Sequence, residues 1–131
     1  MIGDIKIVVM SKMKHESRQK EVPAFRAFYE RLGYKVLELK ETELFEGMGD
    51  TIHHFGKNLL FGGYGHRSDK SAYKELSSKL DVNIVPLELI DERFYHLDTC
   101  FLPIDDETVL LYPKAFTERD LAILKEKYIC N

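Results

Sequence analysis

The chain has 131 residues, 44% of them hydrophobic, which is the size of one compact domain with a single core. Lys and Arg number 19 against 22 Asp and Glu, the net charge is -3, and no basic run occurs, so we expect no nucleic-acid partner. No stretch approaches the roughly 20 apolar residues of a membrane span, and the N-terminus lacks a signal-peptide pattern. We therefore expect a cytoplasmic protein that does not associate with membranes.

The first part of the chain is predicted to form a strand, a helix and a returning strand. Ile5 to Met10 is an apolar run rich in β-branched residues, typical of a strand buried on both faces. Lys14 to Gln19 is polar and is expected to be a loop. Apolar residues recur at near-helical spacing from Val22 to Leu32, with a proline near the start and a glycine after the end. Val36 to Leu39 is the returning strand.

The same order recurs in the middle of the chain. Leu59 to Phe61 is predicted to be a strand, and the glycine-rich segment from Gly62 to Lys70 a loop. The helix is expected over Ala72 to Leu80, because apolar side chains recur there on one face. Val82 to Leu87 is the second returning strand.

A third copy begins with the strand Val109 to Leu111 and the loop Pro113 to Phe116. Thr117, with Asp120 three positions later, is a candidate N-cap for the helix that follows. Tyr128 to Cys130 is predicted to begin the third returning strand.

The repetition predicts an α/β fold built from three modules within a single domain of residues 1–131. The first strands of the copies lie about 50 residues apart, and additional strands are expected at Thr51 to Phe55 and Phe94 to Leu102. Each full module therefore contains strand, strand, helix and strand, with boundaries near 1–42, 43–91 and 92–131. The alternative is an ordinary α/β sandwich whose alternation only resembles a repeat.

Stacked modules that do not close into a ring leave sheet edges and module faces uncovered. We therefore expect a homo-oligomer, or a complementary chain, to cover these open faces.

The first candidate site lies in Phe45-Glu46-Gly47-Met48-Gly49-Asp50, where glycines separate two carboxylates. Glycine permits a loop to fold back, so Glu46 and Asp50 can be aimed at one point and accept the forked N–H donors of a guanidinium. A solvated turn is the alternative, because glycine with acidic residues is also common in turns.

The second candidate site lies in the predicted strand from Phe94 to Leu102. Alternation along a strand would put His96, Asp98 and Cys100 on one face, with the carboxylate able to fix the tautomer of a general acid/base histidine. A hydrogen-bonded structural histidine is the alternative. If the segment is extended, His96 and Cys100 are about 13 Å apart, too far to exchange a proton.

The third candidate is Arg67, in a glycine-rich stretch that matches neither a dinucleotide-binding fingerprint nor a P-loop. Its guanidinium can bind a substrate carboxylate through two hydrogen bonds, and a surface arginine in a turn is the alternative. The two cysteines, Cys100 and Cys130, lack zinc-ligand spacing, so we assign no metal and no cofactor.

Three motifs in order resemble the signature of the pentein superfamily, which contains dimethylarginine dimethylaminohydrolase, arginine deiminase and glycine amidinotransferase. They are Glu46-Gly-Met-Gly-Asp50, Gly63-Tyr-Gly-His-Arg67-Ser68 and His96-Leu-Asp98-Thr99. The segment Met10-Ser-Lys-Met13 with Arg18-Gln-Lys-Glu21 extends the resemblance over nearly the whole chain. The family fold is a five-bladed α/β propeller, so the resemblance implies a partial propeller of about three modules.

The family's chemistry, by this resemblance, is attack of a cysteine thiolate on a guanidinium carbon. The resemblance implies that Glu46 and Asp50 hold the guanidinium, His96 acts as general acid/base, Asp98 orients or supports the site, and Arg67 meets the substrate carboxylate. These assignments are chemically consistent, because the carboxylates fix the guanidinium while the histidine protonates the leaving amine.

The chain departs from the family in its cysteines. The family nucleophile lies in the last module after a glycine-rich stretch, and Cys130 has no such context, so we expect it to be a core residue of a strand. The leading hypothesis is a guanidino-group-modifying domain that binds arginine or a related compound and lacks the nucleophilic module. The alternative is a non-catalytic guanidinium-binding or assembly module.

Overall fold

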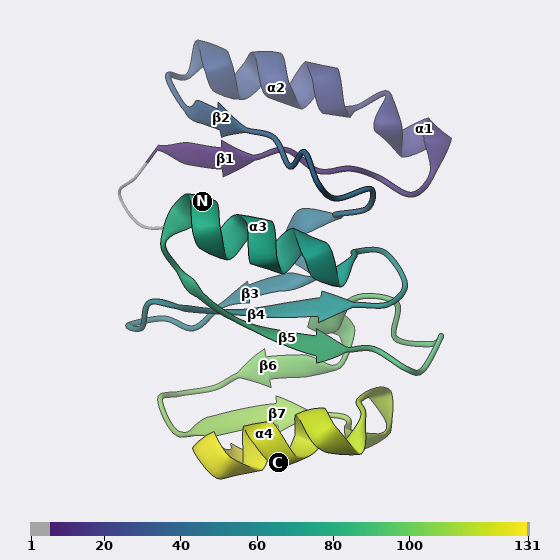
Figure 1. Ribbon diagram of the computed structural model, residues 1–131, viewed down its shortest axis with the longest axis vertical. Helices are drawn as coiled ribbons and strands as arrows, with labels where there is room; N and C mark the ends of the chain where they lie inside the picture. Colours follow the sequence, from purple (N-terminus) through teal and green to yellow (C-terminus); the bar gives the residue numbers. More distant parts are fainter. Residues whose placement is uncertain (1–5, 131) are drawn as a thin grey trace.

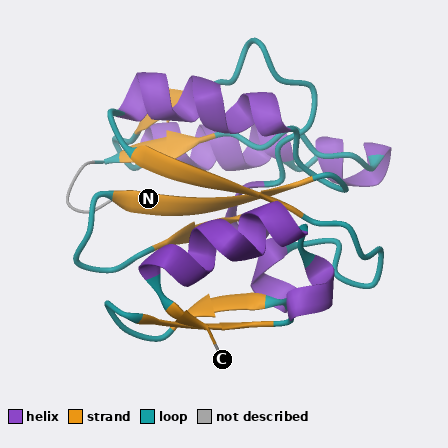
Figure 2. Ribbon diagram, turned by 60° about the horizontal axis from the view of Figure 1, so that its bottom comes forward, coloured by secondary structure: helices purple, strands orange, loops and turns teal. Residues whose placement is uncertain are grey.

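The computed structural model describes residues 6–130, with the side chains of Ile129 and Cys130 outside this description. The chain has a mixed α/β fold with three small sheets, which follow one another in sequence order along the long axis (Figure 1). Strands and helices alternate in layers (Figure 2). No helix within residues 6–130 is long and apolar enough to cross a membrane.

The first sheet has two strands. β1 (Ile7–Val9) pairs in parallel with β2 (Lys35–Leu37), and α1 (Glu16–Gln19) and α2 (Val22–Arg31) lie between them in sequence. All three residues of β1 are half-buried, so the predicted burial of this strand on both faces is wrong. Burial on both faces requires other elements to cover the sheet, and α2, which lies between β1 and β2 in sequence, contains no buried residue. The predicted strand began at Ile5, which lies outside the described residues.

Helix α1 lies in the segment that was predicted to be a loop, whereas α2 confirms the predicted helix. Gly33 follows α2 with a φ of 80°, a left-handed conformation that favours glycine. The apolar face of α2 is exposed: Phe25 is 52%, Phe28 45% and Leu32 49% accessible. The spacing of these residues identified the helix correctly, but α2 contains no buried residue.

The second sheet has the strand order β3-β4-β5. β3 (Thr51–His53) runs antiparallel to β4 (Leu59–Tyr64), and β5 (Asn83–Glu88) runs parallel to β4 after the helix α3 (Lys70–Leu80). The predicted loop over Gly62 to Lys70 is therefore too long at its start.

Positions 62 and 63 lie inside β4, and both are glycine because neighbouring side chains occupy the space that a Cβ atom would need. A Cβ on Gly62 would lie 2.5 Å from the ring of Tyr73, and one on Gly63 would lie 2.8 Å from Cβ of Leu97. These glycines serve close packing within a strand and not the flexibility of a turn.

The third sheet repeats the pattern of the second. β6 (Phe101–Pro103) is antiparallel to β7 (Thr108–Leu111), and β8 (Ile129–Cys130) is parallel to β7 after the helix α4 (Glu118–Lys127). The hydroxyl oxygen of Thr117 accepts a hydrogen bond from the backbone N–H of Asp120 at 3.2 Å, which confirms the predicted N-cap.

Within the described residues the strands form three separate sheets, and the two three-stranded sheets share the same pattern of pairing. The larger hydrophobic cluster contains residues from both three-stranded sheets and from α4. Its buried members include Phe61, Leu87, Leu97, Phe101, Val109 and Leu124. A smaller cluster packs α3 against the segment that follows β2, with Leu39, Phe45, Ala72, Tyr73 and Leu76.

Carboxylates on α3 hold the segment that leads to the acidic loop. Both oxygens of Glu75 accept backbone N–H groups, from Lys40 at 2.7 Å and Glu41 at 3.1 Å. Asp69, the N-cap residue of α3, accepts from the backbone N–H of Leu44 at 2.9 Å. Burial of Glu75 opposes ionisation, but hydrogen bonds from the Lys40 and Glu41 backbone and from Lys79 lower its pKa to about 2.

Candidate functional site

Glu46, Asp50 and His96 converge at one point, although the histidine lies far along the chain from both carboxylates. A 3-10 turn, η1 (Gly47–Gly49), separates the two acidic residues and bends the chain between them. Nε2 of His96 lies 3.2 Å from Oε2 of Glu46, and its Nδ1 lies 3.2 Å from Oδ1 of Asp50. A carboxylate therefore stands beside each nitrogen of the imidazole.

The segment that carries His96 is not the predicted strand. Residues Leu97–Thr99 form the 3-10 turn η2, and the strand β6 begins only at Phe101. The predicted placement of His96, Asp98 and Cys100 on one face of a strand is therefore wrong. Local backbone hydrogen bonds close the turn, and the backbone N–H of Leu97 also donates to Oδ1 of the distant Asp50 at 3.1 Å, a contact that no local pattern encodes.

Gly49 leaves space for the imidazole of His96, because it has no side chain. A Cβ atom on Gly49 would lie 2.9 Å from Cγ and 3.0 Å from Nδ1 of the ring. Any larger residue at position 49 would push the imidazole away from one or both carboxylates. The glycine is thus required by close packing, which the sequence-based argument from loop flexibility did not identify.

Asp50 is an interior carboxylate with 1% exposure. Its Oδ2 accepts a hydrogen bond from the hydroxyl of Ser68 at 2.7 Å, and its Oδ1 accepts the backbone N–H of Leu97. Burial raises the pKa of Asp50 above its ordinary value, while the hydrogen bond from Ser68 and the proximity of His96 oppose that rise. In this conformation Asp50 presents no exposed oxygen for the expected direct contact with a guanidinium.

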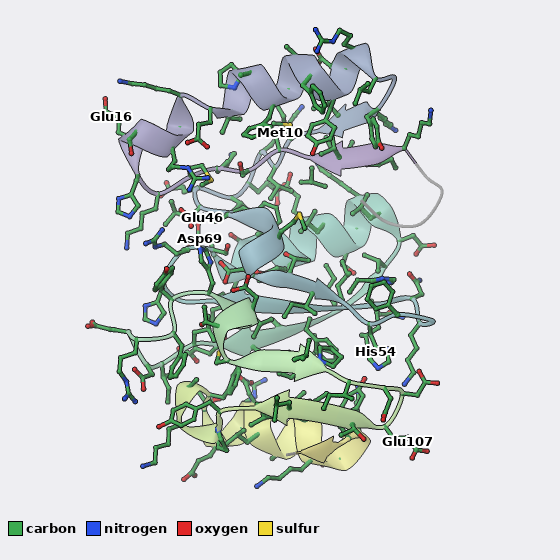
Figure 3. The ribbon with its side chains drawn as sticks, turned by 180° about the vertical axis from the view of Figure 1, so that it is seen from behind. Met10, Glu16, Glu46, His54, Asp69 and Glu107 are labelled. Carbon is green, nitrogen blue, oxygen red and sulfur yellow. The ribbon has the colours of Figure 1, made fainter. Side chains whose placement is uncertain are left out.

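Glu46 already holds a guanidinium, that of Arg67. The Nη1 atom of Arg67 donates to Oε2 of Glu46 at 3.1 Å, and the backbone N–H of Lys14 donates to Oε1 at 3.0 Å. The Glu46 side chain is 3% exposed and that of Arg67 is 23% exposed. Figure 3 shows Glu46 near Asp69, in the region between the first two sheets.

The guanidinium of Arg67 also lies against an aromatic ring. Its Cζ is 4.8 Å from the ring centroid of Tyr95, and the rings of Tyr95 and His96 have centroids 5.0 Å apart. Arg67 thus lies between a carboxylate and an aromatic face. Its expected contact with a substrate carboxylate stays a prediction.

Asp98 is exposed on η2, one residue beyond Leu97. The two carboxylates within 3.2 Å of the His96 imidazole belong to Glu46 and Asp50. Neither of these carboxylates belongs to Asp98, which was expected to fix the tautomer of His96. The contact of Nδ1 with Asp50 does not have hydrogen-bond geometry, so this buried nitrogen has no hydrogen-bond partner among the described residues.

Sequence reasoning missed Ser68, Tyr95 and the backbone of Lys14. Ser68 is 2% exposed and bridges both acidic residues, since its hydroxyl oxygen accepts the backbone N–H of Glu46 at 3.0 Å while it donates to Asp50. Ser68 and Tyr95 each directly neighbour a predicted site residue. Ser68 also belongs to the motif Gly63-Tyr-Gly-His-Arg67-Ser68, whereas for Tyr95 its position next to His96 was the available signal.

Cys100 is a buried free thiol whose Sγ lies 3.6 Å from the carbonyl oxygen of Leu97. Burial raises the pKa of Cys100 to about 11, which disfavours the nucleophilic thiolate at neutral pH. The backbone of Cys130 lies in β8 as predicted, whereas its side chain lies outside the described part of the chain.

Comparison with known proteins relates this geometry to enzymes that act on guanidino groups. The family model of arginine deiminase matches residues 5–128. The bifunctional arginine dihydrolase/ornithine cyclodeaminase ArgZ of Synechocystis sp. is 45% identical over 109 residues, which are 83% of this chain and 16% of that protein. N(G),N(G)-dimethylarginine dimethylaminohydrolase of Mycobacterium tuberculosis is 36% identical over 111 residues, 85% of this chain and 35% of that enzyme.

Solved structures show the same relationship. The substrate-bound N-terminal domain of ArgZ, a C264S mutant of the cyanobacterial arginine dihydrolase, superposes with a TM-score of 0.86 at 40% identity. The match covers 96% of this chain and 48% of that domain. The amidinotransferase SxtG of Microseira wollei, at 18% identity and a TM-score of 0.68, shares the fold.

The chain spans less than half the length of each of these relatives. The family model nevertheless matches almost from end to end, and the fold agrees with that of the solved relatives. The chain therefore belongs to the arginine deiminase family of the pentein superfamily.

Proposed function

We propose that this chain forms the guanidinium-recognising part of a guanidino-group-modifying enzyme, with arginine or a related compound as ligand. The observation that carries this proposal is the meeting of His96 with Glu46 and Asp50, which lie more than 40 positions earlier in the sequence, with a carboxylate oxygen 3.2 Å from each ring nitrogen. The names of the relatives, arginine dihydrolase and dimethylarginine dimethylaminohydrolase, support the same substrate class.

His96 is proposed to act as general acid/base. When a thiolate attacks the guanidinium carbon, the C–N bond to the leaving amine breaks and that amine must gain a proton. Glu46 and Asp50 flank the imidazole, each with one oxygen 3.2 Å from a ring nitrogen, and this limits the directions in which the ring can deliver a proton. Asp50 contributes from the interior, because it is 1% exposed.

Substrate contacts are proposed for the more exposed charges around His96. Asp98 is exposed on η2, two positions after His96 in the sequence, and its carboxylate can accept guanidinium N–H groups. Arg67 uses one nitrogen for Glu46, which leaves further N–H donors for a substrate carboxylate. Glu46 would contact a substrate guanidinium directly only if Arg67 moved aside.

The nucleophilic cysteine is proposed to come from outside this chain. Cys100 is buried, and burial raises the pKa of its thiol to about 11, which disfavours a thiolate nucleophile. We further propose that the modules 1–42, 43–91 and 92–131 are three blades of a pentein-type propeller, completed by further modules or by another chain. The exposed apolar face of α2 supports this need for a covering partner.

The alternative function is a guanidinium-binding or assembly module without catalysis. The pairing of Glu46 with an arginine of its own chain favours it, because the acidic side chain is already neutralised. This alternative predicts binding without turnover even when the missing modules are supplied.

Purified chain is mixed with arginine, agmatine or methylated arginine, and both binding and the release of ammonia or amine are followed. We expect binding without product release by the chain alone. Adding the complementary half of a related domain, with its cysteine, should restore turnover. Product release by the isolated chain would contradict the proposal that the nucleophilic cysteine lies outside it. If the chain bound none of the three compounds, the proposed function would be contradicted.

A further inference from the structure

We propose that Tyr95 is a positioning residue that fixes Arg67 and thereby sets the preference for guanidino compounds that carry a carboxylate. This inference rests on the proposed function, in which Arg67 meets that carboxylate. Four side chains contact one another in a ring. Arg67 contacts Glu46 and Tyr95, and His96 contacts the same two residues.

Tyr95 is not a core residue, since it is 45% exposed. Its ring nevertheless contacts two functional groups, with the Arg67 Cζ 4.8 Å from the ring centroid and the His96 ring centroid at 5.0 Å. A guanidinium over a tyrosine face is attracted by the negative face of the ring. The contacts of Tyr95 therefore act on Arg67 more than on the stability of the fold.

Arg67 is restrained from two sides. Glu46 accepts one N–H at 3.1 Å, and Cζ of the guanidinium lies over the Tyr95 ring, 4.8 Å from its centroid. A planar guanidinium has five N–H donors in a fixed fork, so the donors not used by Glu46 keep a defined direction while the ring holds the plane. A fixed fork can meet a carboxylate with two parallel hydrogen bonds, whereas a freely rotating arginine must first be ordered.

Arginine carries a carboxylate and agmatine does not, so the ratio of their affinities reports on Arg67. The chain also offers a matched aromatic control in Tyr112, whose ring lies 5.9 Å from Cζ of Arg93. Arg93 pairs with Asp91 and not with Glu46. Tyr112 is 37% exposed, so its replacement removes a comparable surface contact between arginine and tyrosine.

The test measures arginine and agmatine affinities for wild type, Tyr95→Leu, Tyr95→Phe and Tyr112→Leu by calorimetry. Wild type should prefer arginine by about tenfold, the effect of one charge-assisted contact. Tyr95→Leu should remove most of this preference, while Tyr95→Phe and Tyr112→Leu retain it. An unchanged ratio in Tyr95→Leu, or equal affinities in wild type, would overturn the inference.

A second measurement does not require a ligand. Exchange of the Arg67 guanidinium protons with solvent, followed by NMR, should be slow in wild type and Tyr95→Phe and clearly faster in Tyr95→Leu. Equal exchange rates in all three proteins would overturn the positioning role. If wild type binds neither compound but Tyr95→Leu accelerates exchange, the proposed function fails while the positioning of Arg67 by Tyr95 stands.

Discussion

The two carboxylates of the acidic loop have different surroundings, although they are only four positions apart. Asp50 is enclosed by Ser68 and the backbone of Leu97, whereas Glu46 interacts with Arg67 and the backbone of Lys14. Both lie 3.2 Å from a nitrogen of the same imidazole. At the scale of single residues, the site is therefore a histidine flanked by two buried carboxylates, of which only Glu46 is paired with an arginine.

Ser68→Ala should destabilise the fold by about 1–3 kcal/mol, because Asp50 loses a buried hydrogen bond and the backbone N–H of Glu46 loses a partly buried one. The hydrogen bond from Ser68 opposes the burial that raises the pKa of Asp50, so its removal should raise that pKa further. A carboxyl pKa that is higher in the folded than in the unfolded state lowers stability as the pH rises above the unfolded-state pKa. At lower pH the carboxyl group is protonated in both the folded and the unfolded state, and the effect disappears. Denaturant unfolding should therefore show a larger deficit at pH 7 than at pH 3.

Ser77→Ala is the control for this variant. The Ser77 hydroxyl donates to the carbonyl oxygen of Val82 at 2.7 Å, a contact with a neutral group. Its deficit should be the same at both pH values. If the deficit of Ser68→Ala also did not vary with pH, the coupling between Ser68 and Asp50 would be refuted.

Gly49→Ala should weaken arginine binding about tenfold or more while the chain stays folded, because the added methyl group would displace the His96 ring. Calorimetry measures the affinity, and circular dichroism checks the fold. Gly56→Ala, at a φ of 79° with nothing within 4 Å of its Cβ, should instead cost backbone strain of about 1–2 kcal/mol and leave the affinity unchanged. Wild-type affinity in Gly49→Ala would disprove the close packing of this glycine against His96.

At the scale of elements, a buried carboxylate on each of α3 and α4 accepts hydrogen bonds from the backbone of a segment that is distant in sequence. Glu75 on α3 accepts two backbone N–H groups and pairs with Lys79 at 2.9 Å. The equivalent group on α4 is Asp120, which accepts the backbone N–H of Glu88 at 2.7 Å. Each helix thus fixes a chain segment that enters or leaves a sheet.

Glu75→Gln should reduce stability at pH 7 by about 1–3 kcal/mol through the loss of charge-assisted hydrogen bonds. The pKa of Glu75 is lowered from 4.5 to about 2 by backbone and Lys79 hydrogen bonds that outweigh its burial. A lowered folded-state pKa stabilises above the unfolded value, so the difference between variant and wild type should shrink as the pH falls from about 4.5 towards 2. Unfolding at several pH values measures this.

Glu126→Gln, at an exposed position of α4, is the control and should have wild-type stability throughout this pH range. A Glu75→Gln deficit that persisted at pH 2 would argue against ionisation of Glu75 as its source.

Helix α3 was predictable because its apolar residues recur at helical spacing on one face. Tyr73, Leu76 and Leu80 recur at helical spacing on α3, and the first two are buried. The segment around His96 was not predictable, because its alternation imitates a strand while a hydrogen bond from Leu97 to the distant Asp50 holds a turn. Local patterns carry no information about such a partner.

The same limit applies to the site. The identities of Glu46, Asp50 and His96 followed from their chemistry and motif order, and the structure brings them together. The division of roles between an interior Asp50 and an arginine-paired Glu46 depends on burial, which the sequence does not encode locally.

At the scale of the whole molecule, the exposed face of α2 and the two-stranded first sheet predict association. Phe28 and Leu32 lie on that face with 45% and 49% exposure. We expect wild type to self-associate at high concentration, or to bind a complementary chain, because exposed apolar surface is buried on association.

Phe28→Glu with Leu32→Glu should shift the protein towards the monomer in sedimentation experiments. Phe55→Glu, at an 84% exposed position in the turn after β3, should not change association. A wild-type chain that stays monomeric at all concentrations and binds no complementary half-domain would disprove the proposed covering of this face.

Calorimetric titration of arginine into wild type, Glu46→Gln and Glu43→Gln tests the central claim most directly. Glu46 anchors both Arg67 and His96, so Glu46→Gln should lower the affinity about tenfold or more, whereas Glu43→Gln, at an exposed position three residues earlier, should bind as wild type does. Equal affinities for Glu46→Gln and wild type, with both proteins folded, would contradict the account.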